Sequence, residues 1–142
     1  MPDVLSVDTH DVIKPLEKFS DNIRIKVTGA ASRAASKIVK KEMVSLARRR
    51  SGALRESIAS RTKVDKAGGR AFSVIGSFKD VVDPNYFRAR DKKISQKYKA
   101  RFFEVGTKYI KADKFITKSL ENTRARVEKE YDSRVEKQLK QL

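Results

Sequence analysis

The spacing of apolar positions divides the chain into helical and extended segments. Between Pro15 and about Ala47 an apolar residue recurs every three or four positions, which predicts a long N-terminal helix. From Ile58 the period changes to two, and the turn-rich residues 65–69 join this run to a second alternating run. The change of period predicts an antiparallel β-hairpin over about residues 57–77.

Further signals predict how these elements begin and end. Gly29 lies inside the N-terminal helix, where a glycine favours a break or kink, and Gly52 is expected to cap the end of that helix. A short helix is predicted over about residues 96–105 and is ended by Gly106. Asp113 is a suitable N-cap for a C-terminal helix over about residues 113–140, which carries an apolar stripe.

Together these elements predict an α+β fold. The long N-terminal and C-terminal helices are expected to pack on the small antiparallel sheet, and residues of about 79–95 form a long basic loop. Residues 1–13 show no sustained period and are expected to form an N-terminal arm. Residues 14–142 then form a single α+β domain, whose C-terminal helix could project towards a neighbouring molecule.

Positive charge is concentrated in blocks. The net charge of +16 comes mainly from residues 37–66, which contribute +7, and residues 86–101, which contribute +6, with a neutral stretch between them. Clustered lysine and arginine side chains gain free energy when they release counterions from phosphate. A surface that faces a polyanion and a basic surface that only maintains solubility both remain consistent with this pattern.

The residue inventory argues against an enzyme. The chain has no cysteine and one histidine, His10, beside Asp8 and Asp11, and no second cluster could complete a metal site. A glycine-rich phosphate loop and a matched pair of carboxylates are also missing, so no catalytic, metal or cofactor-binding residue is predicted. No apolar run is long enough to span a membrane and no signal peptide is visible, which predicts a soluble protein that is not exported by that route. The lack of cysteine suits a reducing cytoplasm or a particle assembled in one.

Two short motifs stand out about fifty residues apart: residues 51–58, Ser-Gly-Ala-Leu-Arg-Glu-Ser-Ile, and residues 102–107, Phe-Phe-Glu-Val-Gly-Thr. Gly52 is expected to turn the helix into the strand, with Leu54 packed below the helix and Ser57 bonded to backbone groups at the strand start. Glu104 lies among apolar residues, so it needs a partner such as Arg55, Arg101 or backbone N–H groups. The Gly-Thr pair predicts a tight turn that directs Tyr109 towards a neighbour.

The order of these features resembles the head-to-tail joining, or tail-completion, proteins of long-tailed bacteriophages, the family of the HK97 gp10 protein. The resemblance covers about residues 14–125, although the proline that usually precedes Phe115 is replaced by Lys114. It implies a non-enzymatic virion protein, in the host cytoplasm during assembly, that forms a ring of six copies at the head–tail junction and encloses the DNA channel. Its partners would be neighbouring connector, stopper and tail proteins, with transient contact to DNA.

The resemblance also implies roles for particular residues. Those at a subunit interface or in a structural motif are Gly52, Leu54, Arg55, Ser57, Phe102, Phe103, Glu104, Gly106 and Thr107. Those on the DNA channel or on a docking surface are Arg48, Arg49, Arg50, Arg88, Arg90, Lys92 and Lys93. Two alternatives remain open: a tail-terminator or tail-tube subunit of the same particle, and a basic nucleic-acid-binding protein unrelated to viruses.

Overall fold

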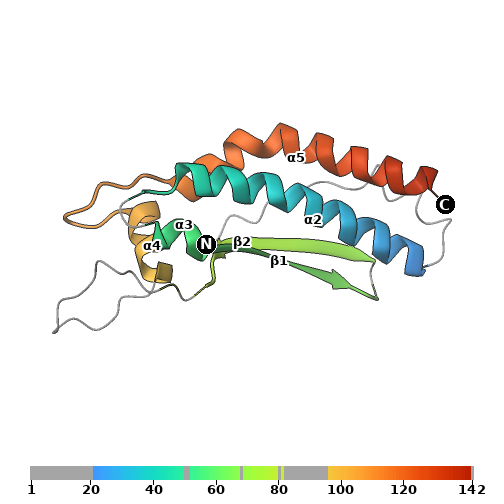
Figure 1. Ribbon diagram of the computed structural model, residues 1–142, viewed down its shortest axis with the longest axis horizontal. Helices are drawn as coiled ribbons and strands as arrows, with labels where there is room; N and C mark the ends of the chain where they lie inside the picture. The colour runs from blue at the N-terminus through green and yellow to red at the C-terminus, as the bar shows by residue number, and fades with distance from the viewer. Residues whose placement is uncertain (1–20, 50–51, 68, 80, 82–95, 142) are drawn as a thin grey trace.

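The computed structural model describes residues 21–49, 52–67, 69–79, 81 and 96–141. Their helices and strands are α2 (Asp21–Leu46), α3 (Ala53–Ser57), β1 (Ile58–Asp65), β2 (Arg70–Ser77), α4 (Gln96–Val105) and α5 (Phe115–Lys140). In Figure 1, α5 runs antiparallel to α2, and the hairpin lies on the opposite side of α2. The predicted α+β fold, with two long helices and a small antiparallel sheet, is confirmed.

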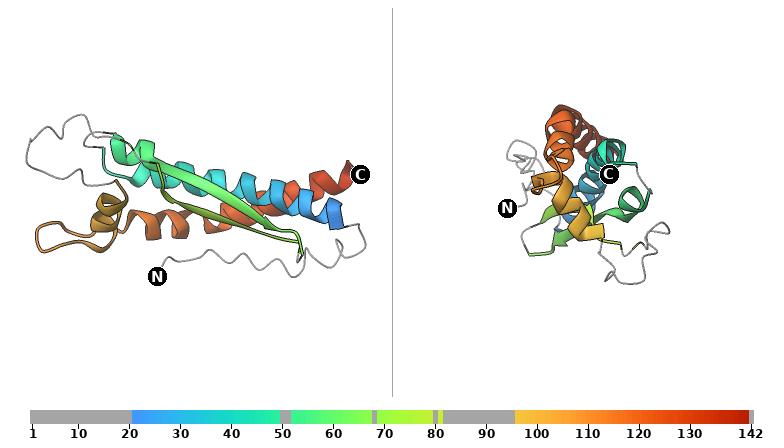
Figure 2. Two further views of the ribbon diagram at one scale, coloured as in Figure 1. Left: turned by 90° about the horizontal axis from the view of Figure 1, so that it is seen from below. Right: turned by 90° about the vertical axis from the view of Figure 1, so that its left-hand side faces the viewer.

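Helix α2 packs against α5 through rows of residues spaced four apart. The buried row of α2 begins at Val27 and continues to Ala47, the residue directly after the helix, and that of α5 runs from Phe115 to Val135. The members between them are Ala31, Ala35, Val39 and Met43 in α2, and Ser119, Thr123, Val127 and Tyr131 in α5. Many of these side chains are small, so the two helices can approach closely along their i±4 ridges. Figure 1 and Figure 2 show the two helices lying side by side along most of their length.

The buried hydroxyl groups of this core are satisfied locally. Ser119 Oγ donates to the Ile116 carbonyl at 2.7 Å, and Thr123 Oγ1 donates to the Ser119 carbonyl at 2.6 Å. Each hydroxyl therefore keeps a partner without requiring water inside the core.

A second row of α2 faces the hairpin and is polar. Thr28 Oγ1 donates to the Gly69 carbonyl at 3.3 Å, and the Ser32 and Ser73 hydroxyls lie 2.8 Å apart. Thr62 extends this group from β1, with its hydroxyl 2.8 Å from that of Ser73. Hydroxyl contacts of this kind fix the position of the sheet on the helix, because misalignment would leave polar groups buried without partners.

Gly29 does not interrupt α2, so the predicted break is wrong. The helix continues from Asp21 to Leu46, and a Cβ placed on Gly29 would lie 3.1 Å from Val64 Cγ2 on β1. The glycine therefore serves the close approach of helix and hairpin, a packing requirement that a helix-propensity argument does not detect.

The predicted hairpin over about residues 57–77 is present. β1 and β2 pair antiparallel from Ile58 opposite Ser77 to Asp65 opposite Arg70. The predicted short helix has the bounds of α4, and the left-handed Gly106, with φ 83°, follows it. The start of the predicted N-terminal helix, the arm at 1–13 and most of the basic loop at 79–95 lie outside the described residues. The division into an arm and one domain stays a prediction.

A candidate interaction site where α2, α3, α4 and α5 meet

Both sequence motifs lie at the same end of the molecule. The C-terminal end of α2, the short helix α3, helix α4 and the first turn of α5 meet there (Figure 1). The fold thus brings together residues about fifty positions apart in the chain. We call this region the motif end, comprising residues 45–49, 52–58 and 99–117.

Glu104 caps the N-terminus of α5. Its carboxylate accepts hydrogen bonds from the backbone N–H of Ile116 at 2.8 Å and of Thr117 at 3.1 Å, and from the Thr117 hydroxyl. The first N–H groups of a helix have no partner within the helix, and the positive end of the helix dipole favours a carboxylate. Of the partners expected for Glu104, the backbone N–H groups are the ones it contacts.

The predicted N-cap, Asp113, does not cap α5. Residue Lys114 occupies the N-cap position in a left-handed conformation, with φ 51°, and its side chain makes no capping bond. The capping group comes instead from the preceding helix, because Glu104 reaches the first turn of α5 across the intervening loop. Nothing in the local sequence at 113–117 signals a cap supplied from twelve residues away.

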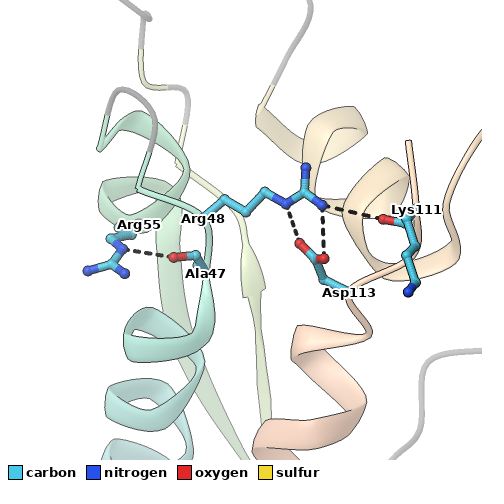
Figure 3. A network of polar contacts seen from close by, with 5 residues as sticks. All are labelled: Ala47, Arg48, Arg55, Lys111 and Asp113. Atoms are coloured by element: carbon cyan, nitrogen blue, oxygen red, sulfur yellow. Dashed lines mark hydrogen bonds and ion pairs between the residues drawn. The ribbon is translucent and has the colours of Figure 1, made fainter. Parts of the chain in front are cut away.

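Asp113 forms an ion pair with Arg48 at the C-terminal end of α2 (Figure 3). Arg48 Nη2 donates to Asp113 Oδ1 at 2.9 Å, and its Nε donates to the other carboxylate oxygen. The guanidinium also lies 4.7 Å from the centre of the Phe103 ring. The hydrogen bond from Arg48 holds the pKa of Asp113 below its usual value, and the same bond raises the pKa of Arg48.

This ion pair predicts a pH dependence of stability. Because the pKa of Asp113 is lowered in the folded state, its contribution is present above the unfolded value of about 4 and is lost as the pH falls through the folded value. We expect Asp113→Asn to lower the free energy of unfolding at pH 7, modestly because the pair is partly exposed.

Urea unfolding of both proteins across the acidic range measures this difference. The difference in unfolding free energy between the two proteins should shrink towards zero as the pH falls below about 4. A difference of the same size at low and neutral pH would contradict the assignment.

Arg55 secures α3 to the end of α2. Its Nε donates to the Ala47 carbonyl at 2.9 Å (Figure 3). Its Nη2 donates to the Ser45 carbonyl at 3.1 Å. These carbonyls belong to the last turn of α2 and its exit, where the helix leaves acceptors unpaired. Arg55 is therefore a capping residue for α2 and is not the partner of Glu104.

Residues Ala53–Ser57 of the first motif form the helix α3, which corrects the predicted direct turn from helix to strand. Gly52 is left-handed, with φ 76°, and occupies the N-cap position of α3 rather than the cap of α2. Leu54 is buried as expected, and the fully buried Ser57 donates to the Leu54 carbonyl at 2.6 Å. The Ser57 hydroxyl also lies 2.7 Å from that of Ser77 on β2, so it links α3 to the hairpin.

The residues after Gly106 form a closed turn. Thr107 and Ile110 exchange backbone hydrogen bonds of 2.8 and 3.3 Å, and Thr107 Oγ1 accepts from the N–H of Tyr109 at 3.2 Å. Tyr109 at the tip of this turn is 88% exposed, with the Lys108 ammonium 5.7 Å from its ring centre. The backbone is thus fixed while the tyrosine is presented to the exterior.

The outer surface of the motif end is apolar and positively charged. Val105 is 71% exposed and Phe102 is 37% exposed, whereas Phe103 is half-buried against the core. Both carboxylates of residues 99–114, Glu104 and Asp113, have partners inside the molecule. The exposed cations around them are Arg101, Lys108, Lys111 and Lys114. This surface therefore combines apolar side chains with a net positive charge.

The predicted basic residues are only partly accounted for. Arg48 is committed to Asp113, and Arg49 is exposed near it. Arg50, Arg88, Arg90, Lys92 and Lys93 lie outside the described residues. Sequence reasoning missed the pairing of Arg48 with Asp113, because the two residues are 65 positions apart and neither belongs to a motif.

The part of the chain that the structure describes contains no candidate metal site and no helix that could span a membrane. Within the described residues, no group of three or more His, Asp or Glu side chains could hold a metal ion. None of the helices in this part of the chain is both long enough and apolar enough to cross a membrane.

The fold and this site define an α+β protein. Its helix caps and a closed turn fix the backbone beneath an exposed surface that is apolar and basic. The chain matches, over residues 10–106, the family model described as "Bacteriophage HK97-gp10, putative tail-component". This match covers more than half of the chain, so the protein belongs to that family of bacteriophage tail components, and the resemblance noted from the sequence is confirmed. Neither the curated proteins nor the solved structures contain a significant match.

Proposed function

We propose that this protein is a structural subunit of a phage particle that forms a ring at the head–tail junction, joining the head connector to the tail around the DNA channel. Membership of a family of tail components supports a place in the virion. The observation that carries the proposal further is the motif end, where internal caps fix a rigid surface with Tyr109, Val105 and Phe102 exposed. Rigid exposed aromatic residues are typical of protein interfaces.

The charge of this surface indicates the kind of protein it contacts. Because Glu104 is bound to the first turn of α5 and Asp113 is paired with Arg48, the surrounding lysines and arginine present positive charge to the neighbour. An acidic face on an adjacent ring would complement it and would guide the two rings together. Duplex DNA alone would match the charge but not the exposed Val105 and Phe102, so these residues favour a protein neighbour.

An image of the assembled particle tests this function. Cryo-electron microscopy of phage particles should place the subunit at the junction, in a closed ring of six copies. Absence from the particle would overturn the proposal, and a position along or at the end of the tail tube would favour the tail-terminator alternative.

Tyr109 provides a test in the particle itself. Tyr109→Ala removes an 88% exposed side chain from a turn whose backbone bonds do not involve the ring, so we expect unchanged stability. We expect head–tail joining in a complementation assay to fall roughly tenfold or more, because exposed tyrosines are enriched among the few residues that carry most of an interface's binding energy.

Tyr109→Phe is the matched control and should retain most of the activity, because it keeps the ring. Wild-type joining by the alanine variant would mean that the turn is not part of the interface.

The basic loop predicts a separate effect. Replacing Arg88, Arg90, Lys92 and Lys93 by glutamine should leave the subunit folded, since lysine and arginine side chains are rarely buried in a core. The yield of infectious particles should fall, because the loop would lose its electrostatic contact with the adjacent ring or with DNA. Circular dichroism and plaque counts measure the two quantities, and an unchanged yield would contradict a role for this loop.

The positive charge of the chain is also consistent with a second function, that of a nucleic-acid-binding protein. A basic nucleic-acid-binding protein would bind duplex DNA at low salt with a steep salt dependence and would form no ring. Filter binding across a salt series, together with light scattering, separates this alternative from the ring.

A further inference from the structure

The two strands of the hairpin have very different outer edges. Within the described residues the sheet contains only β1 and β2, so each strand has one edge without a strand partner. β1 carries the exposed Arg61 and Lys63, and charged side chains of this kind discourage pairing with another strand. β2 carries no charged residue from Ala71 to Ser77. β2 is therefore the edge that lacks protection.

The face of the hairpin that points away from α2 is apolar on β2 and cationic on β1. Phe72 is 50% exposed and Val74 is 47% exposed. In the register of the sheet, Phe72 lies opposite Lys63, and Val74 lies opposite Arg61. A strand added to β2 would place its side chains beside this apolar pair, with positive charge close by.

The chain itself contains a segment of complementary composition. Residues 1–13 include Asp3, Asp8 and Asp11 and no lysine or arginine, although the whole chain carries a net charge of +16. The same segment contains Val4, Leu5, Val7, Val12 and Ile13. It lies outside the described residues. Thirteen extended residues reach about 43 Å, whereas the eight residues of β2 need about 26 Å.

We propose that the open edge of β2 binds the acidic N-terminal segment, residues 1–13, of a neighbouring copy of the chain. This inference rests on the proposed ring, because a segment passed from each subunit to the next makes a head-to-tail contact that closes into a ring. The backbone N–H and C=O groups of the segment pair with the free edge of β2, and its apolar residues cover Phe72 and Val74. Its aspartates lie one strand away from the cationic Arg61 and Lys63 of β1, about 10 Å from them. Duplex DNA would leave Phe72 and Val74 exposed, so the protein segment fits this face better.

Crosslinking of the full-length chain tests the contact. The protein has no cysteine, so Val7→Cys and Val74→Cys introduce the only thiols in two separate preparations. The two are mixed, one of them isotopically labelled, and treated with a flexible bis-maleimide. We expect mixed dimers that join residue 7 of one copy to residue 74 of the other, identified by mass spectrometry of the linked peptides.

Two control sets make the result specific. Lys137→Cys on α5 replaces Val74→Cys and should give few mixed dimers, because it lies on another element. Asp3→Asn, Asp8→Asn and Asp11→Asn together should reduce the crosslinked fraction roughly tenfold, since they remove the negative charges of the segment. The exposed Glu121, Asp132 and Glu136 of α5, changed to Gln, Asn and Gln, remove the same charge elsewhere and should have little effect.

Each remaining outcome also decides the matter. In a chain that carries both cysteines, crosslinks confined to single molecules would show that the segment folds back on its own hairpin, which overturns the exchange between copies. A yield equal to that of the Lys137→Cys control would overturn binding to β2 altogether. A six-fold ring seen in particles together with that result would leave the proposed function intact while removing this contact.

Hydrogen exchange of the unmodified protein gives a second readout that needs no substitution. The amides of residues 71–77 should become protected as the protein concentration rises, and the protection should weaken with added salt. Protection that is independent of concentration would contradict an intermolecular contact.

Discussion

Replacing Gly106 by alanine is expected to lower the free energy of unfolding by about 3 kcal/mol, through left-handed backbone strain and a steric clash that adds to it. Gly106 has a φ of 83°, a region that residues with a Cβ adopt at a cost. A Cβ at this position would also lie 3.0 Å from the Ala112 nitrogen and 3.0 Å from the Ile110 oxygen. Both are backbone atoms of the loop, which cannot move aside as the end of a side chain can.

Gly52→Ala is the matched control for this substitution. Gly52 is also left-handed, with a φ of 76°, but a Cβ there would meet nothing within 4 Å. Its replacement should therefore cost about 1 kcal/mol, the backbone contribution alone. Urea unfolding of the two variants measures the difference, and equal losses would show that the loop adapts to the alanine at 106.

Glu104→Ala is expected to destabilise the protein by about 2 kcal/mol, because the first turn of α5 loses a charged cap. The carboxylate is half-buried and accepts from two backbone N–H groups, at 2.8 and 3.1 Å. After truncation, these groups and the Thr117 hydroxyl would have no equivalent acceptor nearby. The change should appear as a lower urea midpoint with an unchanged slope.

Two further variants separate the cap from a general effect of charge. Glu104→Gln keeps an acceptor oxygen but loses the charge, so it should recover roughly half of the loss. Glu56→Ala removes an exposed glutamate of α3 and should change stability by less than about 0.5 kcal/mol. A Glu104→Ala variant as stable as Glu56→Ala would show that the cap contributes little.

The elements that sequence predicted well are those set by local periodicity. The two-residue alternation around Ile58 and the helical spacing after Phe115 are repeated signals, and both elements appear close to the expected positions. Gly106 likewise marked the end of α4, because a left-handed glycine after a helix is a local requirement. These features depend on neighbours in the chain, so one sequence is enough to find them.

The predictions that failed depend on contacts between distant segments. Gly29 suggested a break from helix propensity, but its role is set by the close approach of Val64 on β1, 35 residues later in the chain. Asp113 had the composition of an N-cap, yet Arg48 engages it and Glu104 performs the capping. In both cases tertiary packing overrides a local preference, and no local sequence pattern reveals which distant residue Gly29 or Asp113 will contact.

The family match and the cap of α5 together indicate that the sequence of the terminal helix can vary. The match ends at residue 106, so α5 lies beyond it, while Glu104, which holds the first turn of α5, lies within it. Two of the three groups that Glu104 binds are backbone N–H groups, which any residue except proline supplies. Glu104 therefore caps the start of α5 through contacts that depend little on the side chains of that helix. A different amphipathic helix could be exchanged at this point and still begin in the same place.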